Sequence, residues 1–142
     1  MEFLNFTLDG QNIGLEWSNG GYADLHNSFK FVDLQYAPAA ATLRLRWQKS
    51  TGDWAKNVPW QGLHLVFEGV TYFRVKERDP DFPISEDDCL RDICCTPSEM
   101  RDDFDNCYTG RNWPAEYDLQ LVFQSEWGIK VNAVTVRLQL ES

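Results

Sequence analysis

Apolar residues recur at every second position over most of this chain, and this period of two constrains its fold most. The clearest example is 42–48 (TLRLRWQ), where Leu43, Leu45 and Trp47 alternate with arginine and glutamine. Successive side chains of a strand point to opposite faces, and one apolar face beside one polar face is typical of an antiparallel sheet. The pattern therefore predicts a mainly β chain.

Similar alternation predicts further strands, at 4–8, 13–17, 29–36, 63–67, 70–76, 117–123 and 129–140. Asp9-Gly10 predicts a tight turn after the first of these, and residues 22–27 are expected to be a connection. The apolar phase slips between Phe31 and Val32, which predicts a bulge or a doubly buried position there. It switches again at Ala133-Val134, which predicts that the last strand bends from one sheet to another. Together these features predict one domain, residues 1–142, built as an antiparallel β-sandwich or flattened barrel of about eight strands.

Residues 79–110, called the acidic segment below, carry most of the charge. They hold ten of the 22 acidic residues and only two basic ones, so they account for −8 of the net charge of −9. Thr96-Pro97 followed by Glu99 resembles a helix capping box, and Ser85 precedes a run of acids typical of a first helical turn. The pattern predicts an insert, 79–114, with two short helices near 86–94 and 97–106.

The acidic balance limits which partners the chain can bind. A pI near 4.6 excludes nucleic acid and anionic membrane as favoured partners, because both attract Lys and Arg. No apolar run reaches the length of a membrane-spanning helix, and the first residues do not resemble a signal peptide, so we expect a cytoplasmic protein of unknown oligomeric state. A basic protein partner suits the charge best. The predicted contact residues are Asp87, Asp88, Asp92, Asp102, Asp103 and Asp105.

All four cysteines, Cys89, Cys94, Cys95 and Cys107, lie in the acidic segment. Their spacing differs from the pairs two to four residues apart that bind structural zinc, and the carboxylates do not follow a calcium-loop pattern. Two disulfides would require an oxidising compartment, so free, packed thiols are the expectation. No metal and no cofactor is predicted.

The remaining polar residues suggest no enzyme. His26 and Ser28 lack the flanking glycines and oxyanion hole that a nucleophilic serine requires, so no catalytic residue is predicted. Trp54, Trp60 and Trp113 fall in or beside predicted loops. They favour either lids over the open ends of the core or, as an alternative function, aromatic platforms of a carbohydrate-binding module.

Two stretches resemble small bacterial immunity proteins of polymorphic toxin systems and related β-domains. One is His26-Asn27-Ser28 leading into the strand at 29–36, although the family usually has Asp where this chain has Asn27. The other is LVFEGV at 65–70. The resemblance implies a non-enzymatic cytosolic protein that binds and blocks a toxin. We therefore expect a non-catalytic protein-binding domain, with a sugar-binding module or a purely structural β domain as alternatives.

Overall fold

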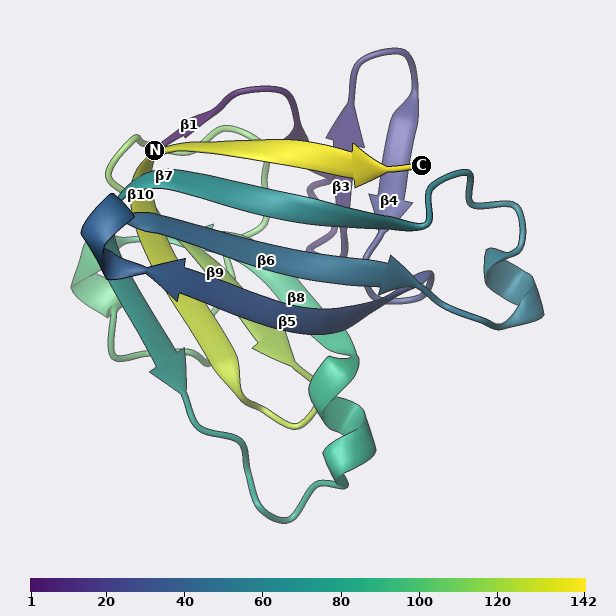
Figure 1. The fold of residues 1–142 in the computed structure, drawn as a ribbon. Coiled ribbons are helices and arrows are strands. Elements are labelled where there is room, and N and C mark those ends of the chain that lie inside the picture. Colours follow the sequence, from purple (N-terminus) through teal and green to yellow (C-terminus); the bar gives the residue numbers. More distant parts are fainter.

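The computed structural model describes residues 1–142, and strands dominate it (Figure 1). The strands are β1 (Glu2–Phe3), β2 (Thr7–Leu8), β3 (Gly14–Trp17), β4 (Gly21–Asp24), β5 (Phe29–Ala37), β6 (Thr42–Lys49), β7 (Gly62–Lys76), β8 (Leu90–Thr96), β9 (Asp118–Phe123) and β10 (Gly128–Glu141). The helical elements are single 3-10 turns: η1 (Pro38–Ala40), η2 (Asp53–Ala55), η3 (Ile84–Asp88) and η4 (Ser98–Met100).

Seven strands form one curled sheet in the order β5-β6-β7-β10-β9-β8, with β1 added parallel to β10. All other pairs are antiparallel, and β2, β3 and β4 form a second small sheet. The curl brings the ring of Phe31 on β5 to 4.9 Å from that of Phe123 on β9 and 5.6 Å from that of Trp127, measured between centroids. The predicted mainly β, antiparallel fold class is confirmed.

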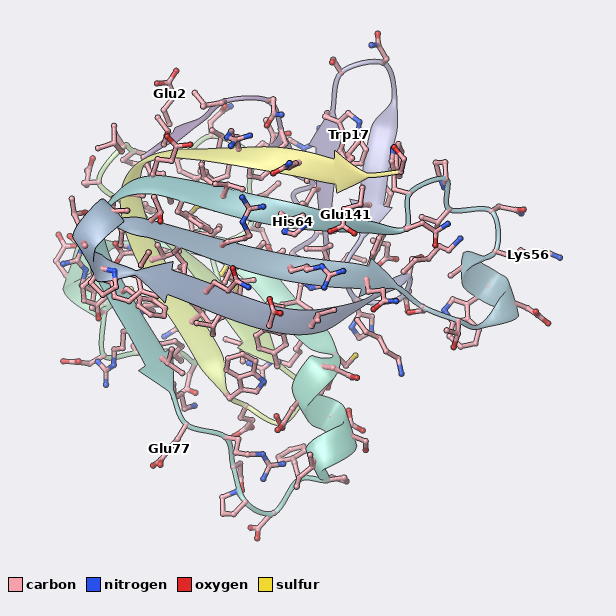
Figure 2. All side chains as sticks on the ribbon, viewed as in Figure 1. Glu2, Trp17, Lys56, His64, Glu77 and Glu141 are labelled. Atoms are coloured by element: carbon pink, nitrogen blue, oxygen red, sulfur yellow. A yellow bond between two sulfur atoms is a disulfide. The ribbon has the colours of Figure 1, made fainter.

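The period of two in the sequence matches the burial of β6. Leu43, Leu45 and Trp47 are fully buried in the core, which a single large cluster of apolar residues fills. Burial of each such side chain stabilises the fold by roughly 1.5–3 kcal/mol. The opposite face of the sheet is polar, and Figure 2 shows His64 on β7 beside Glu141 on β10 there.

Strand β9 differs because all six of its residues are buried, on both faces. Leu119, Leu121 and Phe123 enter the core, whereas Asp118 and Gln120 lie on the opposite face. That opposite face is covered by the chain that follows β8, so part of the acidic segment is a structural cover of the sheet.

The predicted bulge after Phe31 is confirmed, whereas the last strand has an irregularity at Ala133 but does not pass from one sheet to another, because β10 pairs with β7 on both sides of it. The β5–β6 register shifts between Phe31 and Asp33, and the β7–β10 register shifts between Asn132 and Ala133. Thr71 is the extra β7 residue opposite the second shift, and Gly69, whose φ of +69° suits glycine, lies two residues before it, opposite Val134. Strand β7 therefore continues through the bulge to Lys76.

The prediction of two helices in the acidic segment is wrong. Most of 86–94 belongs to η3 and β8, and only one 3-10 turn, η4, lies within 97–106. Leu90, Ile93 and Cys95 are buried on β8, which pairs with β9 from Leu90↔Phe123 to Thr96↔Asp118. The capping signals act only locally, and the strand pairing and burial override them. Residues 22–27 are likewise not simply a connection, because β4 pairs with β3 there.

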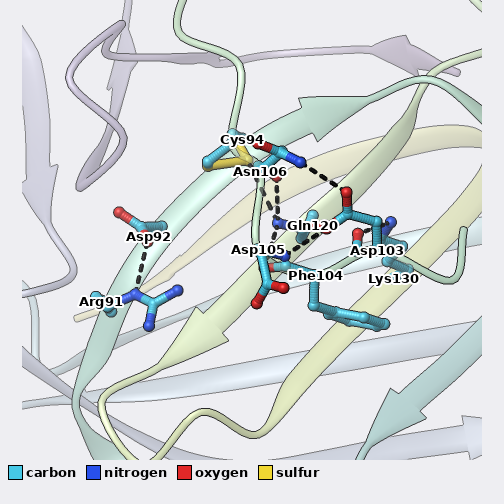
Figure 3. Close-up of a disulfide and its surroundings, with 10 residues drawn as sticks. Arg91, Asp92, Cys94, Asp103, Phe104, Asp105, Asn106, Gln120 and Lys130 are labelled. Atoms are coloured by element: carbon cyan, nitrogen blue, oxygen red, sulfur yellow. Dashed lines mark hydrogen bonds and ion pairs between the residues drawn. A yellow bond between two sulfur atoms is a disulfide. The ribbon is translucent and has the colours of Figure 1, made fainter. Parts of the chain in front are cut away.

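The expectation that all four cysteines are free thiols is also wrong. Cys94 and Cys107 form a disulfide, with Cα atoms 5.7 Å apart, whereas Cys89 and Cys95 are free (Figure 3). Adjacent residues on a strand point to opposite faces, so Cys95 enters the core and Cys94 meets the covering chain. The cytoplasmic location, on which the thiol expectation depended, stays a prediction, and a disulfide is more typical of oxidising compartments.

Candidate functional site

The connection from β7 to β8, residues 77–89, projects from one end of the curled sheet. It is the long loop at the bottom of Figure 1, and it contains η3. Glu77, labelled in Figure 2, marks its start. Pro80 and Pro83 lack the N–H that a sheet ladder needs, so the strand does not continue through them. We call residues 77–89 the β7–β8 loop.

Arg78 connects the beginning of the β7–β8 loop to its later residues. The Arg78 guanidinium donates to both carboxylate oxygens of Asp87, at 3.0 and 3.1 Å, and to the backbone carbonyl of Phe82 at 2.8 Å. The Trp127 indole N–H donates to the carbonyl of Asp87 at 2.8 Å, and the Asp79 N–H donates to the carbonyl of Ser125 at 2.9 Å. The loop is therefore fixed against the turn between β9 and β10.

The electrostatics of Asp87 agree with an internal role. The Ser125 hydroxyl and the Arg78 guanidinium lower the pKa of Asp87 below its ordinary value, because both stabilise the carboxylate against partial burial. Asp88, the next residue, makes no ion pair and lines a hollow beside β5. Of these two predicted contact residues, Asp87 shapes the loop and Asp88 is left with an unpaired charge.

Two more of the predicted contact residues form ion pairs with neighbouring arginines. Arg91 donates to Asp92 at 2.8 Å, and Arg74 forms an ion pair with the almost fully exposed Asp102. Exposed pairs of this kind contribute roughly 0–1 kcal/mol to stability. They still reduce the negative potential that Asp92 and Asp102 present to a partner.

Asp103 is used to shape the loop after η4. Its carboxylate accepts the Asp105 backbone N–H at 2.7 Å and the Asn106 side-chain amide at 2.6 Å (Figure 3). These donors, the Asp105 N–H first, lower the pKa of Asp103. Asp105 itself is exposed and has no side-chain partner, so it is the freest carboxylate of this group.

Buried polar groups hold the same loop against the sheet (Figure 3). The fully buried Lys130 ammonium donates to the carbonyls of Met100 and, at 2.6 Å, Asp103, and it lies 4.9 Å from the centroid of the Phe104 ring. Gln120 donates to the carbonyl of Asn106 at 3.0 Å. Desolvation lowers the pKa of Lys130, against the attraction of nearby aspartates. The backbone of 97–107 is thus a fixed cover of β9 and β10.

The six predicted contact carboxylates do not gather in one patch. Asp87 and Asp88 precede β8, Asp92 lies on it, and the other three follow it. A strand of seven residues separates its ends by about 20 Å at the usual rise per residue. A partner of ordinary size would therefore meet the β7–β8 loop or the loop after η4 as separate surfaces.

The three predicted platform tryptophans are also apart. Trp60 packs edge-on against Trp17 with centroids 5.1 Å apart, and the half-buried Trp113 stacks near Tyr117 and packs on the core. Both cover apolar surface, which agrees with the lid interpretation. Trp54 is different, because 70% of its surface is exposed.

Cys89 and His26 are in contact in the hollow that Trp54 also lines. The sequence alone did not indicate this contact, because 63 residues separate the two. Cys89 Sγ is 3.8 Å from His26 Nδ1. The same nitrogen is 2.5 Å from the carbonyl of Leu90, which needs it as a donor, so it cannot accept the thiol proton. Burial and the negative charges of Glu86 and Asp88 raise the pKa of Cys89, so the thiolate is disfavoured. The pair does not form an activated nucleophile.

No group of three or more His, Cys, Asp or Glu side chains is arranged to hold a metal ion. The structure contains no helix with the length and apolar character needed to cross a membrane.

The fold and these surfaces define an acidic, curled β domain with a fixed projecting loop. No family model, curated protein or solved structure matches the chain. The resemblance to immunity proteins therefore stays a prediction.

Proposed function

We propose that this chain is a non-catalytic protein-binding domain that presents the β7–β8 loop to a basic partner. The observation that carries the proposal is an apolar tip within an acidic loop: Ile84 is 77% exposed and Phe82 is 37% exposed. Exposed large apolar side chains at a fixed loop tip are typical of interaction sites, where a partner removes them from water.

Charge supports the choice of a basic partner. Residues 77–89 carry six carboxylates and one cation, Arg78, which is already paired with Asp87. Glu86 and Asp88 stand beside Ile84 in the turn η3 without ion-pair partners. Complementary charge speeds association and rejects acidic competitors, while the apolar tip supplies burial.

The rigidity of the loop supports binding as well. The hydrogen bonds of Arg78 and Trp127 fix the backbone on both sides of Ile84 before any partner arrives. A surface that is ordered in advance loses less conformational entropy on association. An immunity-like role, in which the partner is a toxin with a basic surface, is the form of this proposal that the resemblance favours.

Paired charge variants test the proposal in a capture experiment. The wild-type chain, the loop variant Asp81→Asn/Glu86→Gln and the control variant Glu99→Gln/Asp105→Asn are immobilised, and captured basic proteins are identified by mass spectrometry. The control removes the same charge from outside the loop. We expect a basic protein that the wild type and the control retain and the loop variant loses.

The tip is tested separately with Ile84→Ser, which should weaken capture of the same protein at least tenfold without a change in thermal unfolding. Equal loss with the loop and control variants would mean that only net charge matters. Retention by Ile84→Ser would remove the loop tip from the interface. Either result overturns the proposal.

A further inference from the structure

Trp54 is the one tryptophan among the exposed large apolar residues, whereas Trp60, which also lies outside the core cluster, packs against Trp17. It lies on η2 in the loop between β6 and β7, it is 70% exposed, and it is absent from the apolar core cluster and the residues packed on it. Leaving most of an indole in water forgoes the burial that makes tryptophan favourable in a fold. A position of this kind calls for an explanation other than stability.

The exposed ring is nevertheless held in one place. Its Nε1–H donates to the backbone carbonyl of Asn27 at 2.7 Å. A Cβ placed on Gly52 would lie 2.0 Å from the nearest ring atom, so the ring packs closely against the glycine backbone. Two contacts fix the ring where no apolar packing does, and a fixed exposed ring is a ready platform for a ligand.

The ring stands at a hollow of about 370 Å³, lined also by Asn27, Lys30, Ser50 and Asp88. The second hollow, of about 350 Å³, shares Lys30, Ser50 and Asp88 and adds Gln48 and Thr51. Each volume is within the range of small-ligand sites. Because they share three lining residues, the two hollows are adjacent, and together they are called the groove, which lies between Trp54 and the start of β5.

The chemistry of the groove selects the class of ligand. In the hollow beside Trp54, Asp88 and Lys30 carry opposite charges, so this hollow favours neither an anion nor a cation over a neutral molecule. Lys49 adds a positive charge to the second hollow, where its ammonium donates to the carbonyl of Val58 at 3.4 Å. Amide, hydroxyl, ammonium and carboxylate groups offer both donors and acceptors to a ligand with several hydroxyls. The indole face packs well against a flat set of C–H groups, which a pyranose ring presents on one side.

We propose that this groove binds a saccharide, with one pyranose ring stacked on Trp54 and its hydroxyls bonded to Asp88, Asn27 and Lys30. Trp60 and Trp113 take no part, because each is packed against another aromatic ring. The adjacent hollow, with Gln48 and Thr51, accommodates a second sugar unit. The site shares Asp88 with the β7–β8 loop but includes neither Phe82 nor Ile84 of its apolar tip, and it does not depend on protein binding there.

The experiment measures binding of a glycan array and of methyl pyranosides at millimolar concentration, using calorimetry and ligand-observed NMR. We expect at least one pyranoside or oligosaccharide to bind the wild type. Trp54→Ala should weaken that binding at least tenfold, and Asp88→Asn should weaken it too. Trp60→Phe is the matched control and should leave affinity unchanged.

Thermal unfolding of Trp54→Ala separates loss of binding from loss of folding. The midpoint should stay close to that of the wild type, because an exposed ring contributes little to stability. Binding of no glycan by the wild type overturns the proposal, as does unchanged affinity in Trp54→Ala. Arginine methyl ester is a second probe. Its binding in a Trp54-dependent manner, in place of any sugar, would assign the groove to a cationic side chain and overturn the saccharide assignment.

Discussion

Arg101 clamps the fully buried carboxylate of Asp118 through two hydrogen bonds, of 2.9 and 3.0 Å. The Asn132 amide donates a third, at 3.0 Å, and the guanidinium lies 3.9 Å from the centroid of the Tyr72 ring. The bond to Asp118 raises the pKa of Arg101, so the cation is always present. This pair ties the chain after β8 to the buried strand β9.

Replacing Arg101 with methionine should therefore lower the free energy of unfolding by roughly 3–5 kcal/mol, because it leaves a buried carboxylate without its counter-charge. Urea denaturation measures the change. Arg137→Met is the control: its ion pair with Glu68, at 3.5 Å, is exposed and should contribute about 0–1 kcal/mol. The double variant Arg101→Met/Asp118→Asn should recover part of the loss. Equal effects of the two single variants would contradict the clamp.

The Cys94–Cys107 disulfide predicts a definite thiol count. Titration with a thiol reagent in denaturant should find two free thiols per chain, Cys89 and Cys95, and four after reduction. The variant Cys94→Ala/Cys107→Ala should lose about 2–4 kcal/mol of stability, since it frees the unfolded chain from a closed loop. Cys89→Ala is the control and should cost less. Four thiols before reduction would exclude the bond.

The raised pKa of Cys89 predicts slow alkylation near neutral pH. Only the thiolate reacts with iodoacetamide, and burial, Glu86 and Asp88 all favour the protonated thiol, against Lys30. The pH at which labelling reaches half its maximal rate should lie above the usual thiol value of about 8.5. Glu86→Gln should move that pH downward, because it removes one of the negative charges. Mass spectrometry of labelled peptides measures the rate, and the buried Cys95 serves as the unreactive reference. An unchanged midpoint would contradict this electrostatic account.

Alternation alone was enough to predict most of the sheet. Leu43, Leu45 and Trp47 alternate because one face of β6 enters the core, and the slip after Phe31 marks a real bulge. β8 was missed because its residues do not alternate. Four of its seven residues are consecutive and buried, since the covering chain hides its second face. A doubly buried strand loses the pattern by which a half-exposed strand is recognised.

The candidate sites were predictable only in part. An acid-rich segment is visible in sequence, but the pairing of Asp87 with Arg78 and of Asp102 with Arg74 depends on tertiary contacts. The Trp54 ring is held in place by a hydrogen bond to the carbonyl of Asn27, which is 27 residues away along the chain. Composition indicates which chemistry a chain can offer, whereas only the folded arrangement decides which groups remain free to use it.

Gly69, close to the bulge between β7 and β10, gives the last prediction. Gly69 has a φ of +69°, and a Cβ there would lie 2.7 Å from Cγ2 of Val134. Gly20 has a similar φ, +76°, with no atom within 4 Å of such a Cβ. Gly20→Ala should therefore show the backbone cost alone, about 1–2 kcal/mol, whereas Gly69→Ala should add a packing cost of about 1–3 kcal/mol. Urea denaturation compares them. Val134→Ala should restore part of the stability lost in Gly69→Ala and none of that lost in Gly20→Ala. Equal losses at the two glycines would show that the Val134 side chain moves aside without a packing cost.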